Sequence, residues 1–201
     1  MLRHVVCLAL LVTPALSATY AIDPAQGKLE VTTAKAGLFK SAGHTHVIRA
    51  TAFRGEVQAD PAHPEASRLN LTIDATSLRV LDPEASASDR ATVQKNMEGD
   101  HTLDVSRFAA IKFVSKKVTV TPKGSASDVV IDGLLQLHGV QQNVRVPCTV
   151  TIAGDLLTAR GEVELRQKDF DITPFSAGLG SVKVKNEVKI TFEIVAKKTG
   201  K

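Results

Sequence analysis

An alternation of apolar and polar residues recurs along most of this chain and constrains its fold more than any other feature. It is clearest near the C-terminus, where lysine, threonine and glutamate residues separate one apolar residue from the next. The apolar residues of that segment are Val182, Val184, Val188, Ile190, Phe192 and Ile194. Successive side chains of a β-strand point to opposite faces of a sheet, so this period predicts strands with one buried face.

Eight segments carry the alternation, and turn residues such as Asp60-Pro61 and Gly154-Asp155 separate them. The predicted strands cover residues 27–36, 46–59, 69–74, 111–121, 129–138, 143–152, 156–166 and 182–194. Consecutive antiparallel strands leave unpaired sheet edges unless the sheet closes, and an eight-stranded barrel can hold one small ligand. A packed sandwich would alternate in the same way, so periodicity alone leaves a hollow barrel and a sandwich open.

One stretch interrupts the strand pattern. Asp82-Pro83-Glu84 combines an acceptor side chain, a proline and an acid, which is typical of a helix start, and good helix formers follow from Ala85 to Glu98. Gly99 ends the predicted helix, and a second turn or short helix is predicted over residues 101–108. The 201 residues show no linker or second composition, so a single domain is expected.

The N-terminus has the order of a secretory signal peptide. A short basic start is followed by an apolar run from Val5 to Val12 and by small residues at Ser17-Ala18. The run is much shorter than the roughly 20 residues that span a bilayer as a helix. Residues 1–18 are therefore predicted to be a signal peptide, residues 19–201 the folded domain, and the protein periplasmic or secreted.

Charge and cysteine content argue against several functions. The 25 Lys and Arg residues nearly balance 21 Asp and Glu residues, without a run of five like charges, so nucleic-acid binding is not predicted. Cys148 is the one cysteine after the predicted signal peptide, and its alternating segment predicts a small, buried or half-buried side chain. No motif of a catalytic nucleophile or phosphate-binding loop is present, so neither an enzyme nor a cofactor is predicted.

Several local motifs, in order, resemble those of the YceI-like family of exported, lipocalin-like proteins. The segments that carry the resemblance are residues 20–24, 44–48 with 53–55, 103–113, 133–140, 167–175 and 182–188. Two positions depart from the family pattern: Phe108-Ala109-Ala110 stands where an aromatic residue and proline are typical, and Asp171 where glycine is common.

The resemblance implies an all-β fold, an antiparallel eight-stranded lipocalin-like barrel with one helical insertion, around a long apolar pocket. It also implies that the protein binds an isoprenoid lipid or a quinone-like amphiphile and is a carrier. The sequence leaves open a transient contact with a membrane and a homodimer. The predicted ligand-binding residues are Phe39, His46, Phe53, Leu71, Ile73, Met97, Leu103, Phe108, Phe113, Leu135, Leu137, Phe170, Phe175 and Phe192.

Two polar features allow other interpretations. His44 and His46 lie two residues apart and would face the same side of a strand, so with a third ligand they could form the metal site of an envelope redox or stress protein. Arg49 shares the parity of Val47 and Phe53, which would turn its guanidinium inward, toward a ligand headgroup or an acid. His138-Gly139 matches the family's His-Gly turn and is expected to be structural.

Overall fold

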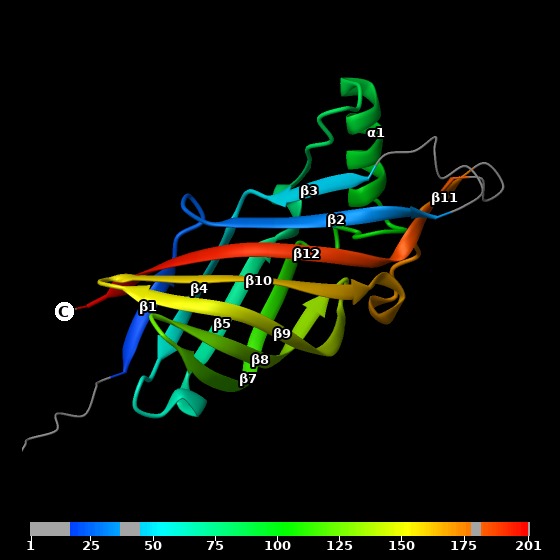
Figure 1. Cartoon of the computed structure of the whole chain (residues 1–201). Helices are drawn as coiled ribbons and strands as arrows, with labels where there is room; N and C mark the ends of the chain where they lie inside the picture. Colours follow the sequence, from blue (N-terminus) through cyan, green and yellow to red (C-terminus); the bar gives the residue numbers. More distant parts are fainter. Residues whose placement is uncertain (1–16, 37–44, 178–181, 201) are drawn as a thin grey trace, which may run out of the picture.

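The computed structural model describes residues 17–36, 45–177 and 182–200 (Figure 1). Its strands are β1 (Ala18–Ile22), β2 (Lys28–Ala36), β3 (His46–Ala50), β4 (Phe53–Ala59), β5 (Arg68–Asp74), β6 (Leu78–Val80), β7 (Ala110–Lys123), β8 (Ala126–Leu137), β9 (Val140–Ala153), β10 (Leu156–Arg166), β11 (Ser176–Ala177) and β12 (Val182–Thr199). The α-helix is α1 (Ala87–Glu98), and the 3₁₀ turns are η1 (Pro64–Ala66), η2 (Ala75–Ser77) and η3 (Gln167–Phe170). All eight predicted segments form strands, and residues 1–16 of the predicted signal peptide lie outside the described residues.

The strands close into an antiparallel barrel. The ring runs β1-β4-β5-β7-β8-β9-β10-β12, and β12 closes it by pairing with β1, so that Thr19 lies opposite Thr199. The first half of β12 pairs with β2 instead, and β3 and β6 extend the wall beyond β2. This arrangement confirms the predicted all-β, eight-stranded barrel with one α-helix.

The predicted strand over residues 46–59 is broken in the middle. Thr51 and Ala52 leave the sheet, and their backbone N–H groups donate to the backbone carbonyl oxygen and to Oγ of the buried Ser77. The break reverses the side-chain parity, so that Ile48 on β3 and Phe53 on β4 are both buried although they are five positions apart.

This reversal turns Arg49 outward, against the interpretation of an inward guanidinium. Its Nη2 atom lies 2.7 Å from Glu30 Oε1 on the outer surface, and Lys28 Nζ lies 2.9 Å from Glu30 Oε2. Partial burial acts to raise the pKa of Glu30, but hydrogen bonds from Lys28 and Arg49 outweigh it and hold the pKa below its usual value. Arg49 is thus a surface ion-pair partner.

Helix α1 begins later than the sequence predicts. Ser86 caps it by accepting a hydrogen bond from the Asp89 N–H, so the helix starts at Ala87, and Asp82 lies before it in the connection from β6. The helix contacts β6, where Gln94 Oε1 accepts from Val80 N–H at 2.9 Å and Gln94 Nε2 donates to the Leu78 carbonyl at 2.7 Å. Residues 101–108 form turns.

The barrel has two unlike ends. Figure 1 shows α1 and β11 at one end, away from the C-terminus. The β8–β9 connection lies at this end, which we call the helix end. The β7–β8 and β9–β10 hairpins and η1 lie at the other, which we call the hairpin end. Among the described residues, no helix has the length and apolar character needed to cross a membrane.

Candidate ligand-binding cavity

The barrel encloses a cavity of about 790 Å³. Its wall is formed mostly by the inward-facing residues of the alternating strands, among them Ile131 on β8, Val146 on β9 and Ile190 on β12. Apolar side chains dominate the wall from one end to the other. The structure therefore distinguishes between the two interpretations of the alternation: the interior is a hollow barrel rather than a packed sandwich. The volume falls within the range of about 300–1,000 Å³ that is typical of ligand pockets.

Ten of the predicted ligand-binding residues line this cavity. They are His46, Leu71, Ile73, Met97, Leu103, Phe113, Leu135, Leu137, Phe175 and Phe192. Met97 from α1 and Leu103 from the following turns close the helix end, where Phe175 is 41% exposed. The structure places these side chains in the cavity wall, and their contact with a ligand stays a prediction.

Three predicted residues lie outside the cavity wall that the described residues form. Phe53 is buried in the core at the β3–β4 break, and Phe170, the last residue of η3, is also buried. Phe108 packs edge-on against His138, with ring centroids 4.9 Å apart. Apolar parity alone does not separate a core residue from a lining residue. Phe39 lies outside the described residues.

His138 has the structural position that was expected. With φ angles of 52° and 77°, His138 and Gly139 form the left-handed turn between β8 and β9. The His138 Nδ1 atom lies 3.1 Å from the Phe170 carbonyl oxygen, which ties this turn to η3. Cys148 is also placed as predicted: it is buried on β9 and lines the cavity, and burial raises the pKa of its thiol to about 11.

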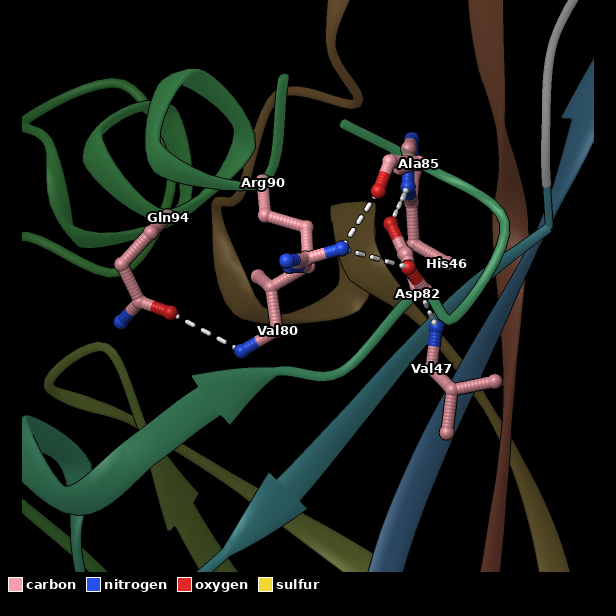
Figure 2. Close-up of polar contacts among 7 residues, drawn as sticks. All are labelled: His46, Val47, Val80, Asp82, Ala85, Arg90 and Gln94. Atoms are coloured by element: carbon pink, nitrogen blue, oxygen red, sulfur yellow. Dashed lines mark hydrogen bonds and ion pairs between the residues drawn. The ribbon is translucent and has the colours of Figure 1, made fainter. Parts of the chain in front are cut away.

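A buried carboxylate that the sequence analysis assigned to a helix start holds His46 instead. Asp82 is 2% exposed, and its Oδ2 lies 2.5 Å from His46 Nδ1 (Figure 2). Its Oδ1 accepts a hydrogen bond from the Val47 N–H at 2.7 Å, and Arg90 on α1 donates to the backbone carbonyls of Asp82 and Ala85. Because a carboxylate accepts and does not donate, Nδ1 of His46 carries the proton. In the neutral ring Nε2 then has a free lone pair.

Thr33 is a second polar residue in the wall that the sequence analysis did not single out. It lies opposite His46 in the register of β2 and β3, so both side chains are on the inner face. Its hydroxyl is buried, and no group of the described residues hydrogen-bonds to it. Thr33 and His46 thus place two polar atoms together in a wall that is otherwise mostly apolar.

The described residues give no support to the metal-site alternative. Among them, no group of three His, Cys, Asp or Glu side chains is arranged to hold a metal ion. His44 lies outside the described residues, and the observed partner of His46 is the single carboxylate of Asp82.

Comparison with known proteins identifies relatives of low sequence identity and similar fold. A UPF0312 protein of Shewanella oneidensis is 30% identical over 105 residues, which cover 52% of this chain and 49% of that protein. The match thus spans about half the length of that relative. A UPF0312 protein of Pseudomonas syringae is 29% identical over 150 residues, or 72% and 70% of the two chains.

Solved structures share the barrel. Burkholderia cenocepacia BcnA superposes with a TM-score of 0.66 at 24% identity, covering 88% of this chain and 99% of that one. A structure described as a polyisoprenoid binding domain from Saccharophagus degradans, implicated in plant cell wall breakdown, has a TM-score of 0.62 at 14% identity, covering 90% and 99%. At these identities the likeness concerns the fold.

The YceI-like domain matches residues 20–196, which include at least part of every strand of the barrel. This match agrees with the ordered motifs of the sequence and with the closed barrel, and the chain therefore belongs to the YceI-like family.

Proposed function

We propose that this protein is a non-enzymatic carrier that encloses the chain of an isoprenoid lipid or quinone-like amphiphile in its barrel, outside the cytoplasm. The observation that carries the proposal is the apolar cavity of about 790 Å³ along the barrel. Burial stabilises a hydrocarbon chain by about 0.8 kcal/mol for each CH₂ group, so such a cavity can hold one without specific polar contacts.

Two further observations support this function. The fold is shared with the domain described as polyisoprenoid binding, and the N-terminal residues have the order of an export signal. A chain that is insoluble in water needs shielding to cross an aqueous compartment, and an enclosed apolar barrel provides it. Binding of this kind requires no chemical reaction at the cavity wall.

Native mass spectrometry of the protein purified from its own cells tests the proposal. We expect an adduct that organic extraction removes and that is identified as a prenyl-chain amphiphile. Ala159→Phe places a ring in the lumen, since Ala159 lines the cavity on β10, and is expected to reduce the bound fraction at least about fivefold. Thr119→Phe adds the same ring at an exposed position of β7 and is the control.

The carrier function is overturned if the protein carries no amphiphile and binds none that is added. It is also overturned if Ala159→Phe, folded and as stable as Thr119→Phe, binds the adduct as well as the unmodified protein does.

A further inference from the structure

We propose that Thr33 and His46 form the headgroup site of the cavity and that they select a neutral hydroxyl headgroup, as in a prenyl alcohol, a phenol or a hydroquinone. This inference rests on the proposed carrier function and adds to it the end of the cavity at which the polar group lies and the chemistry of that group.

The first observation is the unpartnered hydroxyl of Thr33. A buried polar group without a hydrogen bond is costly, and the large majority of such groups in proteins have a partner. Valine has nearly the shape of threonine and would fill this wall position without that cost. The Thr33 side chain lines the cavity, and because its hydroxyl has no partner to lose, rotation about χ1 can turn it toward a polar ligand atom in the lumen.

The second observation is the fixed orientation of the His46 ring. The buried Asp82 carboxylate accepts a hydrogen bond from Nδ1–H of His46, and among the described residues no group hydrogen-bonds to Nε2. In a neutral ring, a carboxylate that accepts from one nitrogen fixes the tautomer, and the other nitrogen is then an acceptor. His46 thus offers a lone pair at the cavity wall, on the strand paired with that of Thr33.

Together the two residues require both a donor and an acceptor from a ligand. A hydroxyl group satisfies both at once, because its O–H can donate to Nε2 of His46 while its oxygen accepts from Thr33 Oγ1. A quinone carbonyl or an ether oxygen can accept from Thr33 but has no proton for His46. Thr33 and His46 therefore favour an amphiphile with a hydroxyl headgroup over one whose headgroup can only accept hydrogen bonds.

Charge argues against a diphosphate headgroup at this end. The Asp82 carboxylate lies directly behind the His46 ring, and Arg90 is engaged with backbone carbonyls. Among the described residues of the wall, Lys183 is the one Lys or Arg side chain at the helix end, and it is exposed. A multiply charged group needs more compensation than this once it is removed from water.

Binding of four matched probes tests the inference: geranylgeraniol, its methyl ether, the hydrocarbon that lacks the hydroxyl group, and geranylgeranyl diphosphate. Each would compete with a fluorescent apolar dye in the full-length protein. We expect the alcohol to bind about fivefold more tightly than the ether, which keeps the hydrogen bond from Thr33, and about 25-fold more tightly than the hydrocarbon, which makes neither bond, at about 1 kcal/mol for each hydrogen bond. The diphosphate is expected to bind more weakly than the alcohol.

Two variants locate the headgroup. Thr33→Val is expected to weaken binding of the alcohol about fivefold and to leave binding of the hydrocarbon unchanged. It removes an unpartnered hydroxyl, so thermal stability should be equal or higher. Ser127→Ala removes a hydroxyl that lines the hairpin end and is the matched control, with no change for either probe.

The outcomes separate this inference from the carrier function on which it rests. Equal binding of alcohol and hydrocarbon, unchanged alcohol affinity in Thr33→Val, a loss in Ser127→Ala instead, or tighter binding of the diphosphate would each overturn the headgroup site while the carrier function stands. Failure of all four probes, the hydrocarbon included, would overturn the carrier function itself.

Discussion

The ring of Phe113 lies against the backbone of Gly133 on the neighbouring strand, where a Cβ atom would stand 2.5 Å from Cζ of the ring. Phe113 is also part of the cavity wall. The missing side chain at Gly133 therefore leaves room for the Phe113 ring, and a similar relation holds between Gly161 and Phe192, where the distance from Cβ to Cζ would be 2.7 Å.

Gly133→Ala is expected to displace the Phe113 ring and to lower the free energy of unfolding by about 1–3 kcal/mol, the usual cost of overpacking. Urea denaturation measures this change. Gly99→Ala is the control, because a Cβ atom at Gly99 would meet its nearest neighbour at an ordinary 3.4 Å. Equal stability of the two variants would show that the ring can move at no cost.

Asp82→Asn is expected to reverse the tautomer of His46. The amide of asparagine can still accept from the Val47 N–H, but its NH₂ group would then face Nδ1 and donate to it, so the ring proton moves to Nε2. ¹⁵N NMR of the imidazole distinguishes the two tautomers. Loss of the charged acceptor should also lower the free energy of unfolding by roughly 1–3 kcal/mol. Asp155→Asn, in the exposed β9–β10 turn, should change neither quantity.

Gln94→Ala is expected to free the outer edge of β6. The Gln94 side chain satisfies the Val80 N–H and the Leu78 carbonyl, which a neighbouring strand would otherwise bind. Loss of both hydrogen bonds should cost about 1–2 kcal/mol and speed hydrogen exchange of the Val80 amide. Lys95→Ala, at the exposed adjacent position of α1, is the control. Unchanged exchange at Val80 would contradict this role.

Alkylation of Cys148 should be slow and steeply dependent on pH. Burial raises the pKa of the thiol from 9.0 to about 11, and the thiolate is the reactive form. Below pH 9 we therefore expect the native thiol to react about 100-fold more slowly than in the urea-unfolded chain, and its rate to rise about tenfold per pH unit up to pH 11. Mass spectrometry of the peptide that contains Cys148 follows the reaction. A native rate equal to the unfolded rate would contradict the burial of the thiol.

The sequence predicts the barrel well because the alternation of its long strands is a property of single segments. The predictions from sequence that were wrong concern places where two segments distant in the chain make contact. The break at Thr51–Ala52 depends on Ser77, which lies 25 positions from Ala52, and no local pattern shows the reversal of parity that turns Arg49 outward. Phe53 has the same apolar parity as a lining residue, and its place in the core follows from this break.

The polar part of the site was less accessible to sequence reasoning. Asp82 precedes a proline and a helix, so it has the local appearance of a helix cap, yet its carboxylate binds β3, 35 positions earlier in the chain. The significance of Thr33 depends on the absence of a partner among the described residues, which only a three-dimensional arrangement can reveal.

The pairing of β12 with both β1 and β2 has a consequence for biosynthesis. A nascent chain that stops short of β12 lacks the strand that pairs with β10 on one side and with β1 and β2 on the other. The ring is therefore sealed only after synthesis has reached its final strand, and contacts between such distant segments form slowly. Until then, the edge of β10 that β12 covers has no neighbouring strand.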